Sequence, residues 1–106
     1  MVSRRQTQVA QRIAEIAAEY FARESNQQSL ITVTRADISP DLKNVLIFLS
    51  VLPEAAEQLV LDFAKRSRSD VREFIKKQTI LKHVPTIDFE IDYGEKNRQL
   101  IDHLTR

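Results

Sequence analysis

Residues 30–52 decide the fold, and they read Leu30-Ile-Thr-Val-Thr-Arg-Ala-Asp-Ile-Ser-Pro-Asp-Leu-Lys-Asn-Val-Leu-Ile-Phe-Leu-Ser-Val-Leu52. The first part, residues 30–38, is rich in β-branched side chains and predicts a strand. Residues 39–42 carry turn chemistry, because proline fixes φ and an aspartate can bond the backbone ahead of it. Residues 44–52 are apolar on both faces, which is typical of a central strand covered on at least one side. The short connection predicts an antiparallel hairpin.

Helices are predicted on both sides of this hairpin. Before it, apolar side chains recur at helical spacing and predict a helix over residues 4–23. After it, Pro53 suits the first turn of a helix, and Glu54 suits the positive end of the helix dipole. The apolar residues from Ala56 to Ala64 then recur at helical spacing and predict a second helix.

The second helix is predicted to break at Ser67 and Ser69 and to continue as a third helix. Ser67 is followed three positions later by Asp70, which matches a capping box for the start of that third helix. Val84-Pro85 is expected to end it, because the residue before a proline disfavours helical geometry. The prediction is therefore an interrupted helix pair between the hairpin and the rest of the chain.

The clearest strand in the sequence covers residues 86–93, where apolar and acidic side chains alternate. Ile87, Phe89, Ile91 and Tyr93 are predicted to share the buried face. Gly94 closes the strand, and residues 95–106 are expected either to dock as a short terminal helix or to fray. The predicted order is α-β-β-α-α-β, an α+β fold with helices packed on a three-stranded sheet. Nearly all of six aromatic residues are predicted to lie in the core, with base stacking by one of them as the alternative: Tyr20, Phe21, Phe48, Phe63, Phe74 and Phe89.

The composition predicts one folded domain over residues 1–106, with 42% hydrophobic and 29% charged residues. The sequence has no run of about 18 apolar residues, which a membrane-spanning helix would need. Its first residues do not resemble a signal peptide. We therefore expect a cytoplasmic protein with no membrane partner. The apolar stripes are each accounted for by one core, so we also expect a monomer.

Positive charge is concentrated between residues 65 and 82, although the whole chain has a net charge of only +1. This window contains seven basic and two acidic residues, so its net charge is +5. Such a local imbalance is typical of a surface that binds a polyanion, although a charge run is also compatible with a solvated helix face. The basic residues are Lys65, Arg66, Arg68, Arg72, Lys76, Lys77 and Lys82. Ser67 and Ser69, at the helix break, fit either caps or backbone contacts to phosphate.

A second basic group, Arg4, Arg5 and Arg12, precedes the first acidic residue of the chain. These side chains fit either a solvated terminus or an auxiliary phosphate contact. The acidic residues nearest to the main cluster in sequence lie before it and after it, which we interpret as a separation of charge that produces an electrostatic field.

Several classes of site are disfavoured. The chain has no cysteine, and its two histidines are far apart in the sequence, so we expect no metal site. A single glycine, Gly94, excludes phosphate-binding loops and dinucleotide fingerprints, which need several. No serine stands in a nucleophile motif. We expect no enzyme activity, no cofactor and no small-molecule substrate.

Three stretches of the chain resemble the ribosome-binding factor A family, whose fold is a type II KH-like domain. They are Arg-Arg-Gln-Thr-Gln-Val-Ala-Gln-Arg-Ile (residues 4–13), the hairpin with its Ile-Ser-Pro-Asp-Leu turn, and Leu-Lys-His-Val-Pro-Thr-Ile-Asp-Phe (residues 81–89). The turn and the Val-Pro-x-Ile-x-Phe strand entry are fairly specific when they occur together. The resemblance covers nearly the whole chain.

The resemblance implies a function in late maturation of the small ribosomal subunit, by binding its ribosomal RNA. Family members bend their RNA-binding helix pair at an Ala-x-Gly kink, whereas this chain has Ser67-Arg68-Ser69 at that position. We therefore expect a break of altered geometry. The alternative from another class is a protein-interaction adaptor that uses the acidic side chains of residues 88–92 (Asp88, Glu90, Asp92) or the C-terminal tail.

Overall fold

The structure is a computed structural model that describes residues 3–24 and 29–94. The predicted element order, α-β-β-α-α-β, is confirmed, with a short 3₁₀ turn added before the second helix. The expected docking or fraying of residues 95–106 lies outside the described residues. The elements are α1 (Arg4–Glu24), β1 (Leu30–Ile38), β2 (Asn44–Leu52), η1 (Glu54–Ala56), α2 (Glu57–Arg66), α3 (Arg68–Gln78) and β3 (Thr86–Ile91).

The three strands form one mixed sheet in the order β1-β2-β3. β1 and β2 are antiparallel, with Leu30 opposite Leu52, and the register shifts at Thr34, where β1 has a bulge. β3 is parallel to β2, with Val45 opposite Ile87. The hairpin allows the antiparallel pair, whereas the parallel pair needs the long crossover that α2 and α3 supply.

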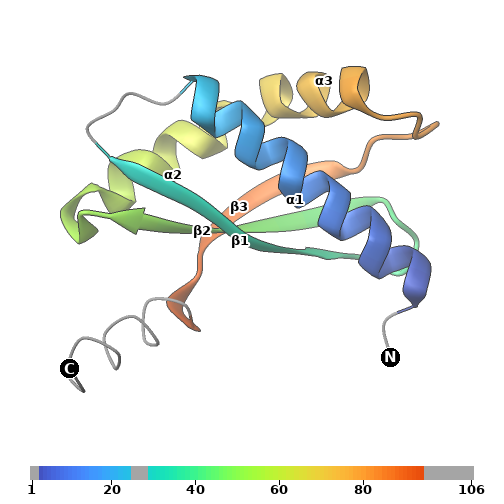
Figure 1. Cartoon of the computed structure of the whole chain (residues 1–106), viewed down its shortest axis with the longest axis horizontal. Helices are drawn as coiled ribbons and strands as arrows, with labels where there is room; N and C mark the ends of the chain where they lie inside the picture. Colours follow the sequence, from blue (N-terminus) through green and yellow to red (C-terminus); the bar gives the residue numbers. More distant parts are fainter. Residues whose placement is uncertain (1–2, 25–28, 95–106) are drawn as a thin grey trace.

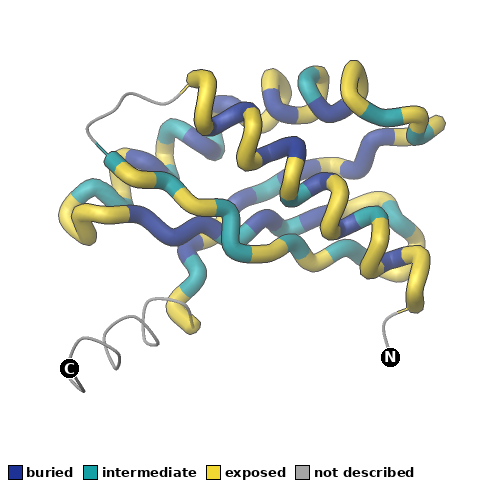
Figure 2. The backbone as a smooth tube through the Cα atoms, in the orientation of Figure 1, coloured by how far each residue is buried: buried dark blue, intermediate teal, exposed yellow. Residues whose placement is uncertain are grey.

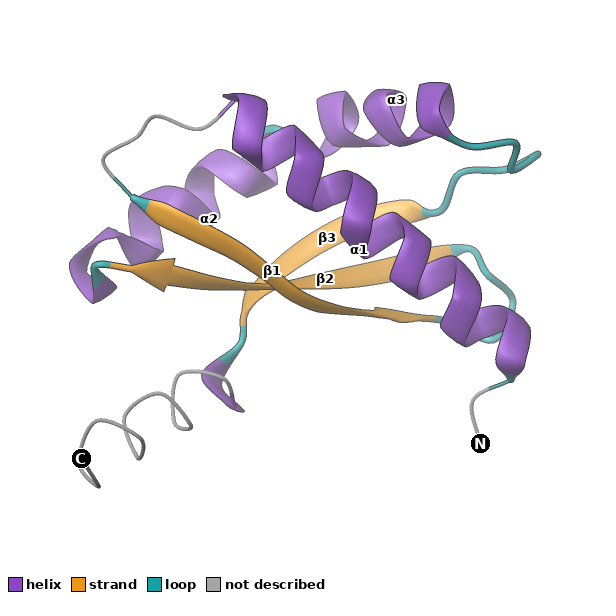
Figure 3. Ribbon diagram, viewed as in Figure 1, coloured by secondary structure: helices purple, strands orange, loops and turns teal. Residues whose placement is uncertain are grey.

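All three helices lie on the same side of this sheet, as Figures 1 and 3 show. Their apolar stripes and the inward side chains of the strands form one core cluster, and Figure 2 shows the buried residues along the helix–sheet boundary. Phe21 of α1 has only 1% of its surface exposed. Its ring makes edge-to-face contacts with Phe89 of β3 and Phe63 of α2, with distances between ring centres of 5.5 Å and 6.2 Å. The architecture is therefore a two-layer α+β fold.

The hairpin turn is held by its own side chains. Ser39 Oγ donates to Asp41 Oδ1 at 2.6 Å, and the backbone N–H of Lys43 donates to the same oxygen at 3.0 Å. The Ser39 hydroxyl, followed by the Lys43 backbone, holds the pKa of the Asp41 carboxyl below its ordinary value. Leu42 takes a φ of 61°, a left-handed conformation that costs strain for a bulky residue. The turn thus projects a well-defined loop at the same end of the molecule as the start of α1.

The third helix ends six residues earlier than predicted. It stops at Gln78, and Thr79 is extended, so residues 79–85 form a connecting loop. Thr79 and Ile80 are both β-branched and favour extended backbone over a helical last turn. The backbone N–H of Leu81 donates to Thr79 Oγ1 at 3.5 Å. Lys82 therefore lies in a loop and not on the helix.

Two aromatic residues lie elsewhere than predicted. Phe48 is half-buried on the sheet face opposite the helices, where the Arg35 guanidinium lies 3.9 Å from the centre of its ring. Tyr93 is 61% exposed, because β3 ends at Ile91 and the alternation does not continue. The other predicted inward residues of β3, Ile87, Phe89 and Ile91, are buried as expected.

Candidate nucleic-acid interface

The break between α2 and α3 is a single residue, Ser67, which we call the elbow. The Ser67 backbone N–H donates to the carbonyls of Phe63 and Ala64, both at 3.0 Å, and its own carbonyl accepts from the N–H of Val71 at 2.8 Å. The backbone therefore stays hydrogen-bonded through the change of direction. Ser67 is only 6% exposed, so the packing there requires a small side chain.

The predicted capping box at the elbow is not formed, because the Ser67 side chain makes no cap hydrogen bond. Ser67 has φ −91° and ψ 4°, and among the described non-glycine residues only Leu42 has a positive φ. The bend therefore does not use the left-handed conformation that favours glycine. Ser69 lies in the first turn of α3 and is exposed. The geometry of the elbow suits serine without strain.

A line of cations, which we call the basic row, consists of Lys65, Arg68, Arg72 and Lys76. Lys65 Nζ and Arg68 Nη1 lie 3.1 Å and 3.5 Å from the same carboxylate oxygen, Asp88 Oδ1. The Arg68 Nε–H also donates to the backbone carbonyl of Lys65 at 2.9 Å. The row therefore begins at the elbow, beside the edge strand β3.

The basic row continues along one face of α3. Arg68, Arg72 and Lys76 are spaced four residues apart, so they share this face over a length of about 12 Å. Arg72 Nη2 donates to the Val84 carbonyl at 2.9 Å, which orients this face of the helix towards the start of β3. Lys76 is exposed and makes no ion pair within the part of the chain that the structure describes.

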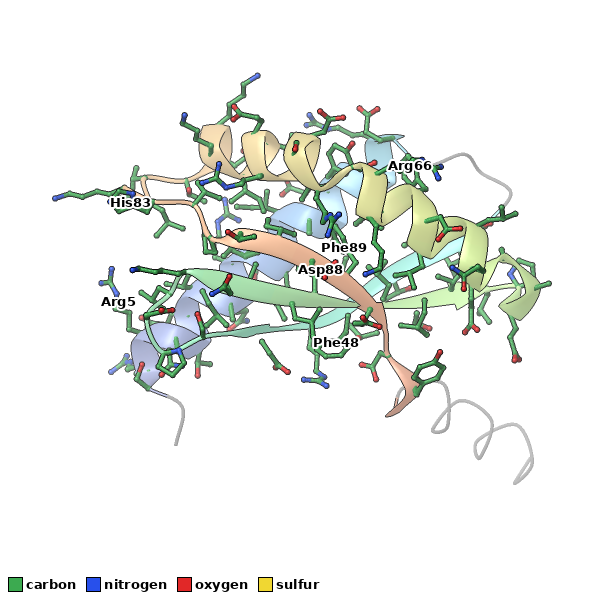
Figure 4. The ribbon with its side chains drawn as sticks, turned by 180° about the vertical axis from the view of Figure 1, so that it is seen from behind. Arg5, Phe48, Arg66, His83, Asp88 and Phe89 are labelled. Carbon is green, nitrogen blue, oxygen red and sulfur yellow. The ribbon has the colours of Figure 1, made fainter. Side chains whose placement is uncertain are left out.

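The other predicted cations of the helix pair lie apart from this row. Lys77 shares its face of α3 with two carboxylates, Asp70 and Glu73, at spacings of seven and four residues. Arg66 is exposed at the end of α2, and Figure 4 shows it at the elbow, apart from Asp88. Charges of both signs are thus interspersed around Lys77, and their fields largely cancel.

The predicted separation of acidic and basic residues is wrong, because the folded structure does not keep the separation that the sequence shows. Asp88 and Glu90 of β3 follow the cluster in the sequence, yet the fold brings them to Lys65 at 3.1 Å and 4.0 Å. Burial raises the pKa of Asp88, but the Phe89 backbone N–H, Lys65 and Arg68 together hold it below its ordinary value. Four cations against two carboxylates leave the row a net charge of +2. The surface is basic, but it already holds anions of its own.

The second basic group occupies the other end of the molecule. Ser3 and Gln6 form a reciprocal capping box at 3.0 Å and 3.1 Å, which fixes the start of α1 and which the sequence analysis missed. Arg5 lines a groove together with Lys82 from the loop after α3, whereas Arg4 is exposed outside it. Figure 4 shows Arg5 and His83 at this same end. Arg12 lines an adjoining hollow.

Lys43 and His83 also line this groove, and the sequence analysis did not select either residue. The signal for Lys43 was its position directly after the hairpin turn, which places it at the end of the sheet where α1 begins. Among residues 3–24 and 29–94, no group of His, Cys, Asp and Glu side chains has a geometry that would hold a metal ion. Within the same ranges, no helix is both long enough and apolar enough to cross a membrane.

The mixed three-stranded sheet, the element order and the basic helix pair beside the edge strand define a KH-like protein of the type II topology. The chain belongs to the ribosome-binding factor A family, whose model matches residues 5–105. A Coxiella burnetii ribosome-binding factor A is 32% identical over 97% of this chain and 88% of its own length. One from Beutenbergia cavernae is 31% identical, over 96% of this chain and 66% of its own length.

Solved structures of the family share the fold. The crystal structure of ribosome-binding factor A from Thermus thermophilus matches with a TM-score of 0.72 and 15% identity, over 81% of this chain and 94% of that one. A Thermotoga maritima structure matches with a TM-score of 0.66 and 22% identity, over 85% of this chain and 89% of that one. A Thermus thermophilus homology model of the factor, fitted into a cryo-EM map of its complex with the 30S subunit, matches with a TM-score of 0.65 and 14% identity, over 85% of this chain and 93% of that one.

Proposed function

We propose that this protein is a non-enzymatic assembly factor that binds the ribosomal RNA of the small subunit during its late maturation in the cytoplasm. Membership of a family of ribosome-binding factors supports the proposal. A relative of the same fold has been placed in a complex with the 30S subunit. The observation that carries the proposal to particular residues is the basic row, which runs along one face of α3 from the elbow.

The basic row suits contact with an RNA backbone. Four cations along one line offer charge-assisted hydrogen bonds to several phosphates, and such contacts position a protein without reading sequence. The aromatic residues of the helix pair, Phe63 and Phe74, are packed against the core, so this face offers no ring for a base to stack on. Recognition therefore depends on the shape of the RNA and on charge. Arg66 and Lys77 add a weaker, non-directional attraction.

The proposed function predicts salt-dependent binding to small subunits. Purified monomeric protein should sediment with purified small ribosomal subunits and not with large ones. If the four cations of the row contact phosphates, raising the salt from about 50 mM to about 200 mM should weaken binding about 50- to 150-fold. Equal binding to both subunits, or binding that does not change with salt, would contradict the proposal.

The ion pairs of the basic row predict that Asp88 competes with RNA. An RNA phosphate that binds Lys65 and Arg68 must displace a carboxylate lying 3.1 Å and 3.5 Å from them. Replacing Asp88 with asparagine should therefore tighten small-subunit binding about three- to tenfold, because the competing charge is removed. Equilibrium binding at fixed salt measures the change.

A matched control separates this local effect from net charge. Glu19 is exposed on α1, and Glu19→Gln changes the net charge by the same amount far from the row. Its affinity should change by less than about twofold, because exposed charges at that distance are screened. Weaker binding by Asp88→Asn would show instead that the carboxylate orients the two cations for RNA.

The adaptor alternative loses support from the same contacts. Asp88 and Glu90 are engaged by Lys65, and Asp92 accepts a hydrogen bond from Thr34 Oγ1 at 2.6 Å. An acidic strand whose carboxylates are satisfied by the chain's own side chains offers little charge to a partner protein. The C-terminal tail, the other contact that this alternative invoked, lies outside the described residues.

A further inference from the structure

A groove lies at the end of the molecule where α1 begins. Its walls are the first turns of α1, the hairpin turn of residues 39–43 and the loop of residues 79–85, and its volume is about 1100 Å³. A second hollow of about 350 Å³ is lined in part by the same residues, among them Val9 and Ile80. Because the groove and the hollow share lining residues, they form one continuous concave surface.

Part of the lining of this groove is aliphatic. Ile80 is fully exposed, although it is one of the most hydrophobic residues of the chain. Leu81 and Val9 lie beside it and are only half-buried. Ile80 follows the premature end of α3, which places it on the loop and not in the core. An exposed aliphatic cluster in a concave surface is typical of a site that binds a protein.

Other residues that line the groove are cationic. Arg5, Lys43 and Lys82 line it, and Arg12 lines the adjoining hollow. The carboxylate of Asp41 also lines it, but one of its oxygens already accepts from Ser39 Oγ and the Lys43 N–H. Arg12 pairs with Glu15 at 3.4 Å. The remaining positive charge selects an acidic occupant.

We propose that this groove binds a segment of a partner protein in which aliphatic side chains are flanked by carboxylates. The aliphatic lining residues take the apolar anchors, and the cationic lining residues take the acidic flanks. A single-stranded RNA would find the cations but little surface for stacking, since the only aromatic ring among the described lining side chains is the imidazole of His83. The site is built from different elements than the basic row, so it does not depend on the RNA-binding function.

Selection from random displayed peptides of about 12 residues tests the proposal, with the folded protein as bait and its Ile80→Ser variant for counter-selection. We expect peptides that combine Leu, Ile or Val with Asp or Glu. A fluorescein-labelled member should lose affinity about tenfold with Ile80→Ser and about three- to tenfold with Lys82→Glu. Leu59→Ser is the matched control, because Leu59 is 75% exposed on α2, away from the groove, and its loss should change nothing.

Three outcomes would overturn the proposal. One is that no peptide distinguishes the protein from Ile80→Ser, once thermal melts show that both are folded. Another is enrichment of basic or purely polar peptides. A third is that Lys82→Glu and Ile80→Ser weaken small-subunit binding about tenfold while no peptide is enriched, which would make the groove an RNA contact. Unchanged small-subunit binding by Ile80→Ser, together with acidic–aliphatic peptides, is the expected result.

Discussion

Replacing Arg68 and Arg72 together with glutamate should weaken binding to small-subunit ribosomal RNA about 100- to 1,000-fold. The two arginines are half of the basic row, and both are exposed on the same face of α3. The substitutions remove two phosphate contacts and place two carboxylates where phosphates would lie, and apposed like charges cost several kcal/mol. Sedimentation with purified small subunits at fixed salt measures the loss.

The fold should survive this double substitution. The ion pair of Arg68 with Asp88 is solvent-exposed, and such pairs contribute about 0–1 kcal/mol to the free energy of unfolding. Arg72 also loses its hydrogen bond to the Val84 carbonyl, which contributes about 1 kcal/mol. A thermal melt should therefore show a cooperative transition at a moderately lower temperature.

Arg66→Glu with Lys77→Glu is the matched control, because it reverses two charges of the same helix pair outside the basic row. Lys77 already shares its face with Asp70 and Glu73, so we expect a loss of at most about tenfold. Equal losses for the two pairs would mean that net charge alone drives binding. Unchanged binding by the first pair, with the fold intact, would remove the row from the interface.

Local patterns in the sequence predicted the hairpin and the first helix almost to the residue. Both depend on neighbours along the chain: β-branched runs and turn residues for β1 and β2, and a long apolar stripe for α1. The end of α3 at Gln78 was not predicted, because Val84-Pro85 was the stronger breaker and the preference of Thr79 for extended backbone was overlooked.

The candidate site was predicted only in part, because counting charges along the sequence does not give the distances between side chains in the folded structure. Lys65 and Asp88 are 23 residues apart in sequence, and only the crossover between β2 and β3 brings them to 3.1 Å. Alternation likewise placed three apolar side chains of β3 correctly. It could not show that the helices cover only one face of the sheet, so Phe48 on the other face was wrongly assigned to the core.

Phe21 and Phe48 therefore give a direct test of the two-layer packing. Phe21 is buried and makes ring contacts with Tyr20, Phe63 and Phe89, so it joins α1, α2 and β3. In the part of the chain that the structure describes, the ring of Phe48 makes no contact with another aromatic ring. It makes only a cation–π contact with the exposed guanidinium of Arg35. Both residues were predicted to lie in the core, but in the structure Phe21 is buried and Phe48 is half-buried on the other face of the sheet.

Replacing Phe21 with alanine should lower the free energy of unfolding by about 3–5 kcal/mol, because it removes a large apolar side chain and leaves a cavity where three elements meet. A domain of this size is stable by only about 5–15 kcal/mol, so the variant should lose a large fraction of its stability and unfold at a much lower urea concentration. Phe48→Ala, the control, should cost about 1–2 kcal/mol, since half-buried surface returns to water and no enclosed cavity forms. Urea titrations of both variants measure the difference. Equal costs would mean that the sheet is covered on both faces, which would contradict the two-layer packing of the described residues.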